Sequence, residues 1–171
     1  MRKIKLSVAN SLDNYIARPD GGFDWILSDQ DYGRASFFKS LDTVLIGRKM
    51  HDLMVKMSSP SFPGMKNYVF SRTKSGRGEG GVEFISGELK SFIALLREQP
   101  GKDIWLAGGG ELVHSFLRER LVDEIRLGVQ PVLLGEGIPL FPPAYPQTNL
   151  RLLKCEPYPT GLVMLAYEMV R

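Results

Sequence analysis

The sequence predicts an α/β protein with a mostly parallel mixed sheet, helices on both of its faces and an antiparallel hairpin at the end. Short apolar runs alternate with helical patterns over most of the chain, and repeated β-α-β units require right-handed crossovers and parallel strands. Two of these runs, 43–46 and 104–107, stop at glycine and turn directly into a helical pattern. After Asp123, apolar and polar residues alternate with the period of a half-buried strand.

The first half of the chain alternates strand and helix patterns around two loops. Ile4, Leu6 and Val8 share one face of the first predicted strand, and Pro63-Gly64 marks the second loop. In order, we predict a strand at 3–9, a loop through 11–22, a helix at 29–40, a strand at 43–46, a helix at 48–56, a strand at 67–71, a glycine-rich turn at 75–81 and a strand at 82–85.

The second half repeats the alternation and then changes to strands. Leu89, Phe92 and Leu96 recur at helical spacing, and Pro100-Gly101 ends that helix. The turn residues Pro159-Thr160-Gly161 predict a hairpin. The elements are a helix at 88–98, a strand at 104–107, a helix at 111–120, a strand at 125–129 and hairpin strands at 150–156 and 162–170. Because no linker or repeat interrupts them, we expect residues 1–171 to form a single domain.

Composition excludes several classes of function. The net charge of +3 is spread without a Lys/Arg run, so nucleic-acid binding is not expected. The lone Cys155 leaves no internal disulfide and no cysteine-based zinc site, and the two histidines fall in separate predicted helices, so no metal is expected. No segment has membrane-spanning length or the form of a signal peptide. We therefore expect a cytoplasmic protein that does not bind membranes.

The two glycine junctions predict phosphate binding. At Gly47 and at Gly108-Gly109-Gly110 a strand ends and a helix begins, so free backbone N–H groups and the positive end of a helix dipole face outward together. In parallel sheets, ligands bind at this carboxyl end of the strands. Two predicted phosphate-binding sites in one small chain favour a dinucleotide as the ligand.

The order of the motifs resembles the dihydrofolate reductase superfamily. The similar segments are Ile46-Gly47-Arg48-Lys49, the run 62–72 ending in Ser71-Arg72, and Ala107-Gly108-Gly109-Gly110-Glu111-Leu112. The runs 11–17, 122–127 and 131–141 are similar to one branch, the reductase domain of the bifunctional riboflavin-biosynthesis deaminase-reductase. The deaminase half of that protein has no counterpart in this chain.

This resemblance implies a dihydrofolate reductase-like three-layer α/β/α fold and an NADPH-dependent reductase. The substrate would be a small pyrimidine-like or pteridine-like heterocycle, and the glycine triplet would contain a cis peptide. Arg48 also stands in the first turn of a helix, where a cation opposes the dipole unless an anion binds there. The expected cofactor-binding residues are Ala9, Ile16, Gly47, Arg48, Lys49, Ser71, Arg72, Thr73, Ala107, Gly108, Gly109, Gly110, Glu111 and Leu112.

The substrate end of the site has weaker candidates. We expect Asp31 as the catalytic acid, with an ordered water as the alternative proton source. Asp13, Trp25 and Phe38 are candidate substrate contacts, although loop aspartates commonly make turns or caps and both aromatic residues suit a core. The element that begins at Trp25 lacks the proline of folate reductases, so we expect dihydrofolate to be a poor substrate.

Two other functions stay open at this point. One is a non-catalytic nucleotide- or flavin-binding module, and the other is a divergent dihydrofolate reductase. The resembling reductases form dimers, and the C-terminal hairpin offers an edge for association. We therefore expect a homodimer that acts on a small molecule.

Overall fold

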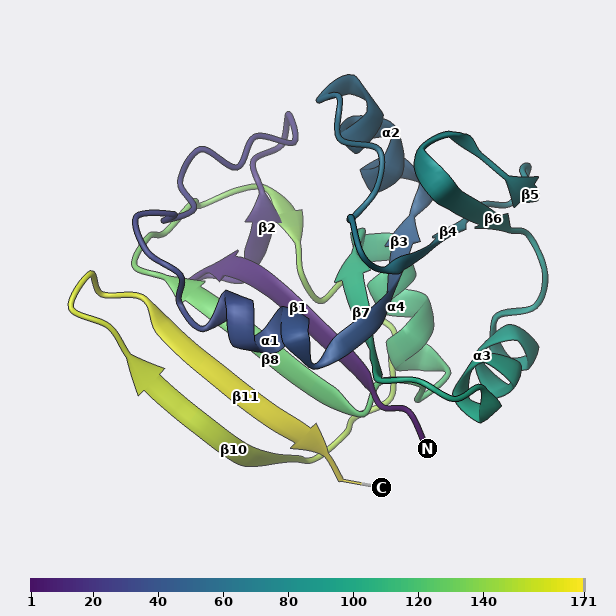
Figure 1. The fold of residues 1–171 in the computed structure, drawn as a ribbon. Helices are drawn as coiled ribbons and strands as arrows, with labels where there is room; N and C mark the ends of the chain where they lie inside the picture. The colour runs from purple at the N-terminus through teal and green to yellow at the C-terminus, as the bar shows by residue number, and fades with distance from the viewer. Residues whose placement is uncertain (171) are drawn as a thin grey trace.

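The protein is built on a nine-stranded mixed sheet of order β10-β11-β8-β1-β7-β3-β4-β6-β5 (Figure 1). The computed structural model describes residues 1–170. The strands are β1 Ile4–Ser11, β3 Leu41–Gly47, β4 Lys66–Phe70, β5 Gly76–Arg77, β6 Val82–Ile85, β7 Asp103–Gly108, β8 Glu124–Gln130, β10 Leu150–Pro157 and β11 Val163–Met169. Strands β8, β1, β7, β3, β4 and β6 run parallel to one another. Strand β11 pairs antiparallel with both β8 and β10, and β5 pairs antiparallel with β6. This architecture confirms the predicted mixed sheet with its C-terminal hairpin.

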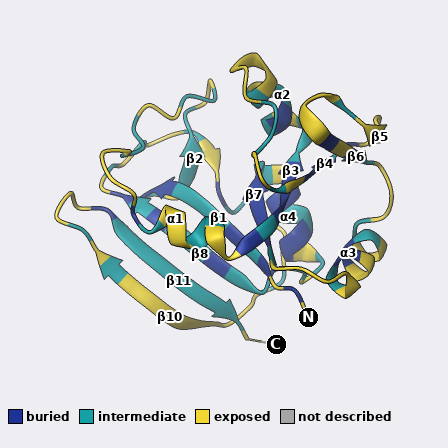
Figure 2. Ribbon diagram, viewed as in Figure 1, coloured by how far each residue is buried: buried dark blue, intermediate teal, exposed yellow. Residues whose placement is uncertain are grey.

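Helices pack on both faces of the sheet and divide the core in two. Leu6, Ile104 and Phe116 belong to one buried cluster, which includes residues of α3 and α4. Val44 and Trp105 belong to the other, against which residues of α1 and α2 pack. The dark blue segments of Figure 2 follow the central strands between these layers. The helices are α1 Arg34–Lys39, α2 Arg48–Lys56, α3 Leu89–Glu98 and α4 Gly110–Arg118, with a 3-10 turn at Glu79–Gly81.

A second, two-stranded sheet lies where the sequence analysis placed no strand. Strand β2 (Tyr15–Ala17) pairs antiparallel with β9 (Ile138–Pro139), and the Leu140 N–H donates to the Asn14 carbonyl at 2.9 Å. These pairings join two segments that are more than 100 residues apart in the chain. They bring the loop after β1 against the C-terminal region.

The helix predicted at 29–40 is wrong over its first half. Tyr32 and Gly33 adopt left-handed backbone angles, with φ of 51° and 70°, so the helix begins only at Arg34. Glycine is permissive of this conformation. The other predicted helices are confirmed to within two residues at their ends.

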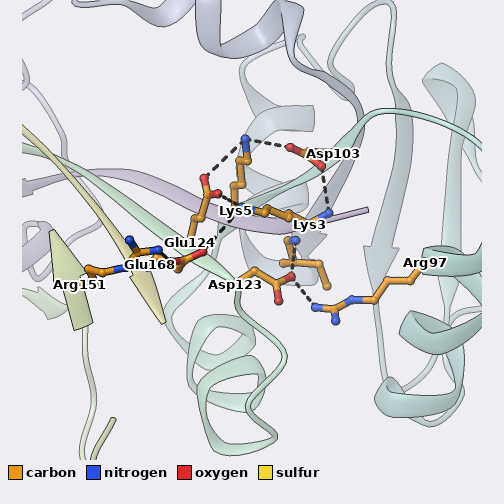
Figure 3. Close-up of polar contacts among 9 residues, drawn as sticks. Lys3, Lys5, Arg97, Asp103, Asp123, Glu124, Arg151 and Glu168 are labelled. Atoms are coloured by element: carbon orange, nitrogen blue, oxygen red, sulfur yellow. Dashed lines mark hydrogen bonds and ion pairs between the residues drawn. The ribbon is translucent and has the colours of Figure 1, made fainter. Parts of the chain in front are cut away.

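Ion pairs and hydrogen bonds join the amino-terminal ends of the central strands (Figure 3). Lys3 Nζ lies 2.7 Å from Glu124, and Lys5 Nζ lies 2.8 Å from Asp103. Asp123 accepts a hydrogen bond from the Ile4 N–H at 2.8 Å. These contacts join β1 to β7 and β8 at the amino-terminal ends of the strands.

Candidate active site

A cleft of about 1420 Å³ lies at the carboxyl ends of the parallel strands and contains the whole predicted cofactor set. It runs from Ala9 on β1, past β7 and β3, to Ser71 after β4. Its lining includes Ala9, Ile16, Gly47, Arg48, Lys49, Ser71, Arg72, Thr73, Ala107, Gly108, Gly109, Gly110, Glu111 and Leu112. The structure therefore brings together residues that are spread over more than 100 positions of the sequence.

Two glycine backbones in contact form the middle of the cleft. Gly47 precedes α2 and Gly109 precedes α4, and neither helix start carries a side-chain cap. A Cβ added to Gly47 would lie 3.3 Å from the Gly108 carbonyl oxygen, and one added to Gly109 would lie 3.6 Å from the Gly47 Cα. First-turn N–H groups lack partners within a helix. The two uncapped helix starts beside this bare backbone fit the phosphates of a dinucleotide.

The turn at the glycine triplet is made by backbone angles rather than by a cis peptide. Residues 1–170 contain no cis peptide bond, so the expected cis Gly-Gly peptide is wrong for this structure. Gly108 and Gly109 instead have φ of 120° and 92°. Residues with a side chain rarely adopt such backbone angles, which explains why glycines occupy both positions.

The β4 end of the cleft is cationic. Arg48 lies 2.7 Å from Asp52 and 3.5 Å from the Ser71 hydroxyl, while Lys74 lies over the Phe84 ring. The Ser71 hydroxyl accepts hydrogen bonds from the Thr73 and Lys74 N–H groups, which shapes this turn. The hydrogen bond from Arg48 holds the pKa of Asp52 below its usual range. Any anion bound by Arg48 must therefore compete with an ionised carboxylate.

One ion pair links the first turns of α2 and α4. Lys49 Nζ lies 2.5 Å from Glu111, and both side chains are largely exposed. The hydrogen bond and charge of Lys49 lower the pKa of Glu111. Glu111 thus places a negative charge beside the predicted phosphate-binding site.

The expected catalytic and substrate aspartates lie elsewhere. Asp31 is exposed, does not line the cleft and accepts a hydrogen bond from the Ala35 N–H at 3.0 Å, at the start of α1. Asp13 accepts from the N–H groups of Leu134 and Gly135 and thereby fixes that loop. Short loop carboxylates readily find such local backbone partners, so neither residue takes the expected place in the cleft.

The two aromatic candidates also lie outside the cleft lining. Phe38 packs on Trp105 with ring centroids 5.1 Å apart, which is the core role left open above. Trp25 is half-buried, and its indole nitrogen is buried with no hydrogen-bond partner. The structure therefore assembles the expected cofactor residues and none of the expected substrate residues.

The inner half of the cleft, defined as the part lined by Trp105 on β7, by α2 with Met57 after it, and by the loop after β2, was not predicted. The side chains that line it are mostly apolar: Phe23, Ile26, Met50, Leu53, Met54, Met57 and Trp105. Met50, Leu53, Met54 and Met57 follow helical spacing, a pattern that is typical of ordinary core packing. Met50 and Met54 do pack on the core, but the same face also lines the cleft.

Two absences within residues 1–170 bear on the site. No group of three or more His, Cys, Asp or Glu side chains is placed to hold a metal ion. No helix in this part of the chain is long and apolar enough to cross a membrane.

The fold and the cleft define a protein with a dihydrofolate reductase-like fold. Dihydrofolate reductase from Enterococcus faecalis, solved with NADP(H), matches with a TM-score of 0.74 at 15% identity, over 99% of this chain and 97% of that chain. Residues 2–164 match the model of the RibD C-terminal domain family. The chain belongs to that family.

Individual relatives agree with this assignment. The Bacillus subtilis protein YyaP is 36% identical over 98% of this chain and 95% of its own. The "Putative riboflavin biosynthesis protein" of Shewanella sp. PV-4 has a TM-score of 0.88 at 27% identity, covering 99% of both chains. A Thermotoga maritima deaminase and 5-amino-6-(5-phosphoribosylamino)uracil reductase matches at 0.74 and 15% identity, over 99% of this chain and 57% of that chain.

Proposed function

We propose that this protein is an NADPH-dependent reductase of a small heterocyclic substrate. The observation that carries the proposal is the pair of uncapped helix starts at Gly47 and Gly109, which meet in the middle of one large cleft. Membership of the RibD C-terminal domain family supports a reductase of the riboflavin-pathway type.

Each part of the cleft has a distinct task in this proposal. The helix starts after Gly47 and Gly109 would hold the pyrophosphate, while Ala9 and Ile16 would flank the nicotinamide. Bound NADPH supplies a hydride, and the protein supplies orientation and a dry pocket. Because Asp31 lies outside the cleft, we assign the accompanying proton to an ordered water.

The preference for NADPH over NADH rests on the cationic end. Arg48 and Arg72 line the cleft beside Ser71, and charge-assisted hydrogen bonds to phosphate are about twice as strong as neutral ones. The 2′-phosphate that distinguishes NADPH would bind here. Arg48 would then exchange part of its contact with Asp52 for the phosphate.

Thermal melting with each nucleotide tests this proposal. A ligand that binds only the folded state raises its stability by RT ln(1 + [L]/Kd), so NADPH should raise the Tm more than NADH at equal concentration. FMN serves as the comparison ligand. Stabilisation by FMN alone would favour a non-catalytic flavin-binding module, and NADPH binding without oxidation by any heterocycle would favour a nucleotide-binding module.

We also propose that two copies associate through the C-terminal hairpin. Strand β10 is the outer strand of the sheet, and Leu150, Leu152 and Leu153 on it are 44%, 53% and 46% exposed. Exposed edges of this kind invite pairing with another chain. Light scattering should give the mass of a dimer, and Leu152→Asp should lower it. A monomeric wild-type protein would contradict the proposal.

A further inference from the structure

We propose that the inner half of the cleft binds an uncharged, planar, largely apolar substrate that carries no phosphate. This inference rests on the proposed function, because it takes the outer half, which contains Arg48, Arg72 and the two helix starts, as the place of the dinucleotide. It departs from the phosphoribosyl compound in the name of the Thermotoga reductase.

The walls of the inner half are apolar and are left open to solvent. Phe23 from the loop, Leu53 from α2 and Met57 just after α2 are 44%, 41% and 57% exposed, and all three line the cleft. Figure 1 shows this loop, between β2 and α1, and α2 beyond the same end of the central strands. An exposed apolar patch in a concave site marks a surface that a ligand covers.

The floor of the inner half is the closely packed Trp105 ring, which offers few polar groups. The Trp105 indole N–H donates to the Ser7 carbonyl at 3.1 Å, so it is already committed. The Trp105 ring is held by Phe62 and Phe38, with centroids 4.7 and 5.1 Å away. A flat apolar ring suits such a floor, whereas a multiply charged group finds no partner on it.

Four of the cations that line the cleft pair with carboxylates outside its inner half, and the fifth, Arg72, follows the end of β4. Lys49 pairs with Glu111 on α4, and Lys90 and Arg118 both pair with Glu119. Arg48 pairs with Asp52 and reaches Ser71, after which Arg72 follows. These contacts belong to the outer half and to the α3–α4 side.

Two further cationic side chains near the inner half, Arg126 and Arg18, make their contacts outside the cleft. Arg126 pairs in register with Ser7, but its guanidinium covers the Phe37 ring at 4.8 Å and donates to the Tyr32 carbonyl. Arg18 pairs with Asp24 at 2.7 Å. Neither residue is part of the cleft lining. A phosphate in the inner half would lose its hydration without gaining a cation, which is strongly unfavourable.

Two dyes with the same ring system test this inference. N-phenyl-1-naphthylamine is neutral, whereas 8-anilino-1-naphthalenesulfonate adds one fixed negative charge, and both fluoresce when they enter an apolar site. With the full chain saturated by NADP⁺, the neutral dye should bind at least about tenfold more tightly than the sulfonate. Equal or tighter binding of the sulfonate would overturn the inference.

Two matched variants locate the dye. Leu53→Asp places a charge on the apolar wall and should weaken binding of the neutral dye by about tenfold or more. Leu95→Asp makes the same change on α3, outside the cleft lining, at a side chain that is 64% exposed, and should leave binding unchanged. Absence of neutral-dye binding, or equal effects of the two variants, would contradict the inference.

A separate readout distinguishes failure of this inference from failure of the proposed function. Calorimetric titration with NADP⁺ tests the dinucleotide half alone, and the Leu53→Asp comparison is repeated without nucleotide. If NADP⁺ gives no binding heat while Leu53→Asp still weakens dye binding, the proposed function fails and the apolar inner site stands. If NADP⁺ binds and the dye ignores Leu53→Asp, only the inner site fails.

Discussion

The outer and inner halves of the cleft are built in different ways. The outer half is made of backbone at three strand ends, where Gly47, Ser71 and Gly109 lie within or beside short local motifs. The inner half is made of apolar side chains from the loop after β2, from α2 and from Trp105. Local motifs can be recognised in a sequence. Apolar side chains that come from distant segments and line a cleft have the same sequence pattern as residues of an ordinary hydrophobic core. The difference also separates the tasks, because the outer half fits an anion and the inner half fits a neutral ring.

The largest expected effect concerns the bare backbone of the outer half. Gly109→Ala adds a methyl group where φ is 92° and where Gly47 lies 3.6 Å away. We expect NADPH affinity to fall by at least about 100-fold, or about 2.7 kcal/mol, because the altered turn misplaces the first N–H groups of α4. Isothermal titration measures this loss.

Gly64→Ala is the matched control for that change. Gly64 also has a positive φ, 78°, but a Cβ there meets nothing within 4 Å, and the residue is not part of the cleft lining. Both variants should lose a similar amount of thermal stability, because both carry backbone strain. Normal NADPH binding by Gly109→Ala would reduce the triplet to a structural turn.

The next effect concerns the choice between NADPH and NADH. Arg48→Ala removes a charge-assisted contact of about 1.5–3 kcal/mol, so the ratio of the two affinities should shrink by about tenfold or more. Arg34→Ala, which changes an exposed arginine of α1 outside the cleft lining, should leave the ratio unchanged. An unaltered ratio in Arg48→Ala would assign the 2′-phosphate to another cation.

A smaller effect is expected at the ion pair between α2 and α4. Glu111→Gln removes a negative charge beside the predicted phosphate-binding site and releases Lys49, so NADPH should bind about threefold more tightly. The hydrogen bond with Lys49 lowers the pKa of Glu111, so this carboxylate is fully ionised near neutral pH. The gain should therefore be constant from about pH 6 to 8. Weaker binding of NADPH by the variant would make Glu111 a direct ligand.

The smallest effect is expected at Asp31. Dihydrofolate should be a poor substrate, because the carboxylate that the sequence analysis assigned to catalysis holds the start of α1 instead. Asp31→Asn should change turnover of any accepted substrate by less than about twofold and leave stability nearly unchanged, because an asparagine oxygen can accept the same backbone hydrogen bond. Robust dihydrofolate turnover that Asp31→Asn abolishes would make this a divergent folate reductase.

The sequence predicted the fold, and it named the residues that gather in the outer half of the cleft, because both depend on local signals. The glycine triplet and Gly47 stand at strand ends, and the alternation of residues 125–129 indicates a half-buried strand. The pairing of β2 with β9 was missed because it joins segments that are distant in the chain. Asp31 was misplaced because Tyr32 and Gly33 leave the helical conformation, and nothing in the local pattern distinguishes a capping carboxylate from a catalytic one.

Mapping NADP⁺ on the isotope-labelled protein by NMR tests the central claim most directly. The account predicts that saturating NADP⁺ shifts the backbone amide signals of 47–49, 71–73 and 108–112. Signals of Asp13, Asp31 and the outer strand β10 should stay in place, because these residues lie outside the cleft lining. Absence of shifts, or shifts confined to residues outside the cleft, would contradict the assignment of this cleft to a dinucleotide.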